Sequence, residues 1–133
     1  MFQVSPTTLR QVLAIDAVLG LGMGLSHLSR PADLSAWLGL PENWLRLAAL
    51  TVLVAASMAG WLAMRQRPPG GAVRALALGN FGWVVLSLWV VLGAGLALTP
   101  LGLAWVILQA VVVFVLAGLE WAGSNRAPGA ALA

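Results

Sequence analysis

Long apolar stretches separated by short polar ones dominate the pattern of this chain. Four such stretches, rich in Leu, Val, Ala and Gly, cover about residues 9–28, 44–64, 72–98 and 101–123. A helix needs about 20 mostly apolar residues, at about 1.5 Å each, to cross the hydrocarbon layer of a bilayer. The pattern therefore predicts an all-α transmembrane four-helix bundle.

The polar breaks between the stretches predict how the spans are joined. The segment between Pro31 and Pro41 is too short and too polar to cross a membrane, yet its apolar residues recur at helical spacing: Leu34, Trp37 and Leu38. This spacing predicts a short helix that lies in the membrane interface between the first and second spans. Thr99 and Pro100 predict a tight connection between the third and fourth spans.

The ends of the chain are polar or poor in apolar bulk. Ser5, Pro6, Thr7 and Thr8 are typical of a helix start, with a hydroxyl that caps free amides and a proline in the first turn. Residues 124–133 predict a mobile cytoplasmic tail, which leaves residues 1–123 as one transmembrane domain.

Composition supports the membrane assignment and excludes several function classes. Of 133 residues, 61% are hydrophobic and 8% are charged, and the mean hydropathy is +0.95. Soluble domains carry about 25% charged residues, so the lipid bilayer is the expected partner. The chain has no cysteine, which excludes disulfides and thiolate chemistry.

All seven basic residues are arginines near the ends of the apolar stretches. With four spans, one side of the membrane carries Arg10, Arg65, Arg67, Arg74 and Arg126, and the other carries Arg30 and Arg46, offset by Asp33 and Glu42. The positive-inside rule then predicts a bacterial inner-membrane protein with both termini in the cytoplasm. No basic face with interleaved aromatics is visible, so no nucleic-acid partner is expected. A re-entrant first stretch, favoured by its glycines, is the alternative topology.

Asp16 is the candidate site residue that the pattern singles out, because it lies well inside the first span. Counted at about 1.5 Å per residue, Asp16, Ser57 and Asn80 fall on the order of 10 Å from the cytoplasmic end of three different spans. Trp83 lies one turn beyond Asn80 on the same face, so its indole N–H can reach this polar layer. The layer is either structural, fixing helix register through hydrogen bonds, or a site for a proton or a small polar solute.

Ser87 and Gln109 predict a second layer, about 20 Å from the cytoplasmic end. An amide at this depth is more often a hydrogen-bonding link between helices than a ligand. Together the two layers would line a narrow polar seam.

The remaining polar residues predict neither catalysis nor a metal site. His27, the only histidine, is expected at the outer interface, bonded to headgroups, with a role as an axial haem ligand as the alternative. Glu120 is expected to reach water or Arg126. No catalytic motif, paired carboxylate at one depth or metal-ligand cluster is visible, so the sequence predicts no enzyme, no cofactor and no metal.

Most tryptophans are expected at the membrane interfaces: Trp37, Trp44 and Trp105 outside, Trp61 and Trp121 inside. Trp83 and Trp89 lie in the middle of the third span, where a ring either packs against lipid or walls an apolar pocket.

Small residues recur four apart on the first two spans, as Gly20 with Gly24 and Ala56 with Gly60. They favour tight packing of these two spans within one bundle. Formation of a homo-oligomer, or docking against a larger membrane complex, is the alternative.

Three runs of the sequence, SPTTLRQVLAIDAVLGLGMG, LSAWLGLPENWLRLAAL and ALGNFGWVVLSLWVVLG, resemble small, uncharacterised four-span bacterial membrane proteins. The order of spans, with a proline-bounded segment after the first, is similar to that of the DoxX-like four-helix proteins. The resemblance implies a four-helix membrane bundle and transfers no active-site residue.

The sequence thus predicts a non-catalytic bundle that acts as an accessory or interaction subunit in the membrane. A small transporter or channel-like protein that uses the Asp16, Ser57 and Asn80 layer is the alternative. A third possibility is a protein that contacts lipid or pigment through its mid-span tryptophans.

Overall fold

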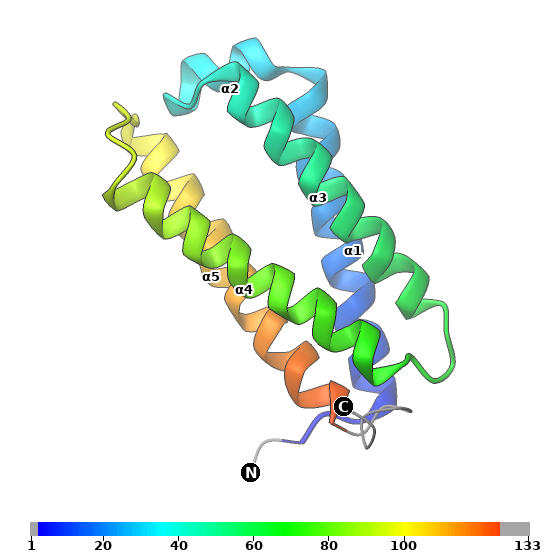
Figure 1. Ribbon diagram of the computed structural model, residues 1–133. Coiled ribbons are helices and arrows are strands. Elements are labelled where there is room, and N and C mark those ends of the chain that lie inside the picture. Colours follow the sequence, from blue (N-terminus) through cyan, green and yellow to red (C-terminus); the bar gives the residue numbers. More distant parts are fainter. Residues whose placement is uncertain (1–2, 126–133) are drawn as a thin grey trace.

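Four long helices and one short helix make up the computed structural model, which describes residues 3–125 (Figure 1). The helices are α1 (Pro6–Ser29), α2 (Pro31–Leu38), α3 (Glu42–Ala63), α4 (Gly70–Leu92) and α5 (Pro100–Ser124). All except α2 are long and apolar enough to cross a membrane. The prediction of an all-α bundle of four spans with a short helix after the first is confirmed, whereas residues 126–133 of the expected tail, with Arg126, lie outside the described residues.

Two of the long helices begin with the same capping arrangement. The hydroxyls of Ser5 and Thr99 accept hydrogen bonds from the backbone N–H groups of Thr8 and Gly102, at 3.1 and 2.9 Å. A proline follows each cap, where a missing N–H costs nothing. The helix start expected at residues 5–8 is therefore confirmed.

The third span is shorter than the sequence predicted, because α4 ends at Leu92 and not at Leu98. Gly93 caps the helix, and its N–H donates to the Trp89 carbonyl at 2.8 Å. Gly95 then adopts a φ of 68°, which favours glycine and ends helical continuation. Residues 93–99 form an irregular connection in place of the expected tight turn.

Close backbone approach holds α1 against α3. A Cβ atom on Gly20 would lie 2.8 Å from the Ala56 Cβ, and one on Gly24 would lie 2.6 Å from Leu53 Cγ. Only glycine leaves room for this spacing, so the small residues confirm the predicted tight packing of the first two spans.

The four long helices form two pairs that separate along the bundle. α1 packs along α3 and α4 packs along α5, whereas α3 and α4 touch only lightly. The pairs converge where α1 begins and α5 ends, here named the termini end, and diverge toward α2, here named the α2 end (Figure 1). The core is correspondingly split into two clusters, one at each end.

At the α2 end, the last turn of α2 ties the two pairs together. The Thr99 N–H donates to the Leu38 carbonyl at 3.1 Å, and the Thr99 hydroxyl donates to the Trp37 carbonyl at 2.5 Å. The backbone of Gly102 packs directly against the Leu38 carbonyl. The last turn of α2 therefore links the two helix pairs at the end where they diverge.

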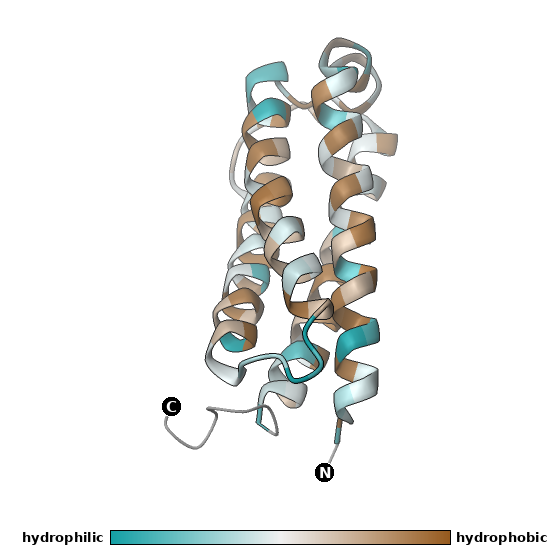
Figure 2. Ribbon diagram, turned by 90° about the vertical axis from the view of Figure 1, so that its right-hand side faces the viewer, coloured by the Kyte–Doolittle hydropathy of each residue, from teal (hydrophilic) through white to brown (hydrophobic). Residues whose placement is uncertain are grey.

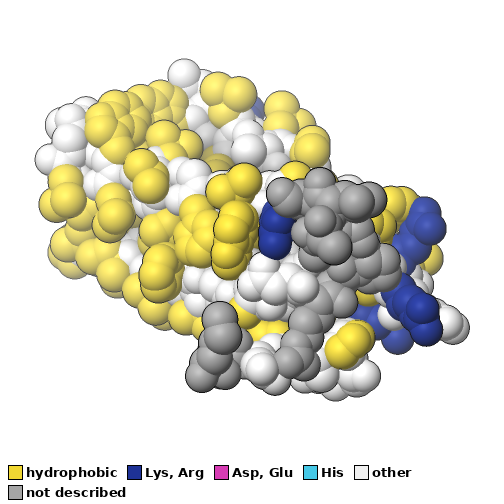
Figure 3. Space-filling view, turned by 60° about the horizontal axis from the view of Figure 1, so that its bottom comes forward, with side chains coloured by type: hydrophobic (Ala, Val, Ile, Leu, Met, Phe, Trp, Pro, Cys, Tyr) yellow, Lys and Arg dark blue, Asp and Glu magenta, His cyan; other side chains and the backbone are white. Residues whose placement is uncertain are grey.

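The surface of the bundle differs between the bodies of the helices and their ends. Hydrophobic residues run along the length of the helices, and the hydrophilic residues lie mostly near the helix ends (Figure 2). The space-filling view shows basic side chains clustered at the termini end beside a largely hydrophobic body (Figure 3). This distribution is that of a multi-pass membrane protein.

Candidate functional site

Three polar side chains from three helices meet inside the bundle: Asp16 of α1, Asn80 of α4 and Glu120 of α5, here named the acid cluster. The Asn80 Nδ2 atom donates to Asp16 Oδ2 and to Glu120 Oε2, each at 3.0 Å. Their exposed fractions are 9% for Asp16, 7% for Asn80 and 0% for Glu120. Two carboxyl groups thus share one amide in the part of the bundle where the helix pairs converge.

The directions of the helices explain why these residues meet. Side chains lean toward the N-terminus of their own helix. α1 and α4 both run away from the termini end, so Asp16 and Asn80 lean back toward it. α5 runs the opposite way, so Glu120 leans inward from near the helix end.

The structure therefore corrects two expectations. Glu120 does not reach water, because it is fully buried, and two carboxyl groups do meet within the bundle. Arg126, the other expected partner of Glu120, lies outside the described residues. Gly123 packs against Leu9, and a Cβ on it would lie 2.7 Å from Leu9 Cδ1. This close contact brings the last turns of α5 against the start of α1, the same region in which Glu120 and Asp16 share Asn80. The sequence signal was available: an acid within an apolar helix, four residues before its last residue, with the small residues Ala122 and Gly123 in the following turn.

Ser57 does not belong to the layer in which the sequence placed it. Its hydroxyl donates to the carbonyl of Leu53 on its own helix at 2.7 Å, and the side chain is exposed. The face of α3 that packs on α1 carries Ala56 and Ala59. Ser57 is rotated about 100° from Ala56 around the helix, so it lies on a different face from the one that packs on α1.

We expect Ser57→Ala to leave stability nearly unchanged, within about 0.5 kcal/mol, because the hydroxyl satisfies only its own helix. Thermal unfolding of the detergent-solubilised protein checks this. A loss of more than about 2 kcal/mol would place Ser57 in an interhelical contact that the structure does not contain.

Trp83 belongs to the second layer and not to the first. Its Nε1 donates to Gln109 Oε1 at 2.7 Å, and Gln109 Nε2 donates to Ser87 Oγ at 2.9 Å. The structure thus brings together Ser87 and Gln109, as expected, and adds Trp83 to them. Asn80, Trp83 and Ser87 lie on one face of α4, so both polar groups line the boundary between the two helix pairs.

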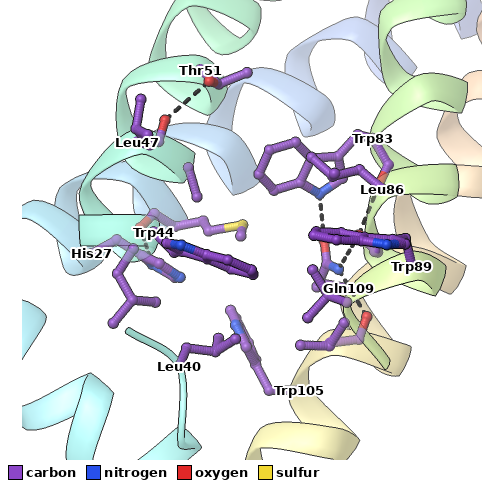
Figure 4. Close-up of a pocket in the computed structure, with 16 residues that line it drawn as sticks. His27, Leu40, Trp44, Leu47, Thr51, Trp83, Leu86, Trp89, Trp105 and Gln109 are labelled. Carbon is purple, nitrogen blue, oxygen red and sulfur yellow. Dashed lines mark hydrogen bonds between the residues drawn. The ribbon is translucent and has the colours of Figure 1, made fainter. Parts of the chain in front are cut away.

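A cavity of about 380 Å³ lies between the helix pairs toward the α2 end (Figure 4). Four tryptophans line it: Trp44 of α3, Trp83 and Trp89 of α4, and Trp105 of α5. The rings of Trp44 and Trp89 face each other across the helix pairs, with centroids 5.8 Å apart and planes 20° from parallel. The volume lies within the range of about 300–1,000 Å³ that is typical of small-molecule sites.

His27 lines the same cavity, which corrects the expectation that it binds headgroups at the interface. It is only 3% exposed, and its ring centroid lies 6.2 Å from that of Trp105. Nδ1 lies 2.7 Å from the Met23 carbonyl, an acceptor, so Nδ1 carries the hydrogen and Nε2 carries the lone pair. Between residues 3 and 125, no side chain pairs with this Nε2 atom.

Trp44 and Trp105 were expected at the interface, and the structure shows that they also wall this cavity. Trp83 and Trp89 wall it as well, and Trp89 also exposes 49% of its surface on the outside of the bundle, so it meets both alternatives for these mid-span rings. Among the residues that the structure describes, no group of three His, Cys, Asp or Glu side chains is placed to hold a metal ion.

Fold and site together define a four-span α-helical membrane protein with a buried acid cluster and a tryptophan-lined cavity. Comparisons with protein-family models, curated proteins and solved structures gave no match to this chain. The resemblance to DoxX-like proteins therefore remains an expectation from the sequence.

Proposed function

We propose that this protein binds a lipid-soluble small molecule in the cavity between its two helix pairs, without transforming it chemically. The observation that carries the proposal is the cavity itself, which four tryptophans from three helices line. Ligand sites are typically concave and apolar, with a few placed polar groups.

The polar groups in the wall indicate which chemistry the ligand presents. Gln109 and Ser87 are already bonded to each other and to Trp83, so they offer little to a ligand. His27 Nε2 offers a lone pair at the cavity wall. A hydroxyl group on an otherwise apolar molecule would donate to it, while the tryptophan rings cover the apolar part.

A quenching titration tests the proposal with a long-chain alcohol brominated in its chain, because bromine quenches tryptophan fluorescence on contact. We expect saturable quenching for the wild-type protein. Ala48 lines the cavity, so Ala48→Phe fills it and should weaken binding at least tenfold, or about 1.4 kcal/mol.

The matched control is Ala104→Phe, which adds the same ring at an exposed position on α5 outside the cavity. It should bind the alcohol as the wild type does. Non-saturating quenching that is identical in all three proteins would mean that the probe only partitions into the detergent or lipid, and would reject the proposal.

Charge placement supports an orientation within the membrane. By the helix bounds, the termini end carries four arginines: Arg10 near the start of α1, Arg74 near the start of α4, and Arg65 and Arg67 between α3 and α4. At the other end, Arg46 pairs with Glu42 at 3.1 Å. We therefore propose that the termini end faces the cytoplasm and that the protein resides in a bacterial inner membrane.

The accessory-subunit function expected from the sequence remains a second proposal. The exposed apolar side chains along the spans are what lipid contact requires, so they do not favour a protein partner over lipid. For the alternative of a small transporter, the polar site would contain Glu120 in place of Ser57, beside Asp16 and Asn80.

A further inference from the structure

The acid cluster contains an unfilled hydrogen-bonding position that is independent of the cavity. Asn80 has two amide hydrogens, and it donates one hydrogen bond to each carboxyl group. Glu120 Oε1 is buried and has no hydrogen-bond partner within residues 3–125. Because Glu120 has no exposed surface, bulk water does not reach this oxygen either. A buried oxygen without a hydrogen-bond partner destabilises the fold, so a proton or a hydrogen-bond donor is expected at this oxygen.

The cluster also lacks a neutralising side chain. The basic groups on the helices around it are Arg10 of α1 and Arg74 of α4, and both are engaged elsewhere. Arg10 Nε donates to the Ala63 carbonyl at 3.1 Å, and Arg74 donates to Ser124 Oγ at 3.2 Å and to Asn125 Oδ1 at 2.8 Å.

The other two packed helices bring no cation either. The charged residues of α3 are Glu42 and Arg46, which pair with each other at the α2 end, and Glu120 is the charged residue of α5. Two ionised carboxylates enclosed without a counter-charge would cost several kcal/mol.

A single proton would satisfy the unpartnered oxygen and also remove one of the two buried charges. Asp16 and Glu120 each lie 3.0 Å from the same Asn80 nitrogen, so their bonded oxygens are at most twice that distance apart. Both carboxyl groups therefore border the same amide, and a proton on either of them removes one of the two buried charges. Calcium needs about six to eight oxygen ligands, more than these side chains provide.

We propose that Asp16 and Glu120 form a proton-binding site that holds one proton between the two carboxyl groups. Asn80 positions both groups by donating one hydrogen bond to each. The protonated oxygen donates to the other carboxylate, so the pair carries one negative charge, stabilised by the Asn80 amide.

Infrared spectroscopy of the protein in lipid nanodiscs at neutral pH tests this site, because a protonated carboxyl group gives a separate C=O stretching band that shifts in D₂O. We expect the intensity of one buried protonated carboxyl group per chain, calibrated against a free acid. The double variant Asp16→Asn with Glu120→Gln keeps the side-chain shapes and should lose the band completely.

Each single variant should shift or remove the band, because the remaining carboxyl group has lost its carboxylate partner. Asp33→Asn is the matched control, since Asp33 is an exposed acid on α2 that lies 4.0 Å from Arg30, and it should leave the band unchanged. Near-ultraviolet circular dichroism verifies the fold of each variant.

Three results would overturn the proposal: no protonated band in the wild-type protein, two protonated groups per chain, or a band that appears only when choline replaces sodium. The last result would assign the site to a metal cation. None of these measurements involves the tryptophan cavity, so the proton site and the ligand proposal can fail separately.

Discussion

Asn80→Leu should destabilise the protein by about 3 kcal/mol, one of the two largest effects expected from a single substitution. The asparagine supplies a hydrogen bond to each of two buried carboxyl groups, at 3.0 Å in both cases. Leucine has a similar volume but no donor, so both acids would remain buried without it. Reversible unfolding in mixed detergent micelles, followed by circular dichroism, measures the change.

Adding Glu120→Gln to Asn80→Leu should recover at least half of the lost stability. A glutamine amide can donate to Asp16, and the change removes one of the two acids. A double variant as unstable as the single one would show that the cost comes from packing around position 80 and not from unpaired carboxyl groups.

The second large effect is expected at Gly102, where α5 crosses the end of α2. A Cβ atom there would fall on the Leu38 carbonyl, 2.7 Å from its carbon and 3.0 Å from the Leu38 Cα. Because backbone cannot yield as a flexible side chain can, Gly102→Ala should cost about 3 kcal/mol. The same clash should separate α2 from Thr99 and weaken the link between the two helix pairs at the α2 end.

Gly118→Ala is the matched control, on the same helix. A Cβ at position 118 meets no atom within 4 Å, and the residue is exposed. Alanine should therefore be neutral or stabilising by up to about 1 kcal/mol. Equal stabilities for the two variants, measured by the same unfolding assay, would contradict the tight α2–α5 contact.

The long elements of the fold could be predicted because each depends on a local signal. Apolar length located the four spans, and Ser5 followed by Pro6 located the start of α1. The prolines at 31 and 41 bracketed α2. Only the end of α4 was misplaced, because Gly93 and Gly95 are common in apolar spans and the positive φ of Gly95 cannot be recognised from composition.

The acid cluster was predictable only in part, because the sequence gives depth more readily than direction. Asp16 and Asn80 lie on helices that run the same way, so counting residues from the same end brought them together. Glu120 lies on an antiparallel helix and leans inward, which a count along the axis leaves out. The prediction for Ser57 was wrong because counting residues does not show which face of the helix carries a side chain. Its hydroxyl bonds only to its own helix.

The sequence allowed an apolar pocket at Trp83 and Trp89 as one alternative, but the position of the cavity and its other walls could not be predicted because they depend on how the helix pairs diverge. Trp44 and Trp105 lie near helix ends, where tryptophan is ordinarily explained by the membrane interface. Their role as walls follows from the light contact between α3 and α4 and from the tie between Thr99 and α2. Both are long-range features that no local pattern encodes.

The most direct test of the ligand-binding account is native mass spectrometry of the protein released from a mild detergent. The account predicts the chain mass plus one small-molecule adduct for the wild type and for Ala104→Phe, and the chain mass without the adduct for Ala48→Phe. A wild-type chain that carries no adduct, or an adduct that Ala48→Phe retains in full, would contradict it.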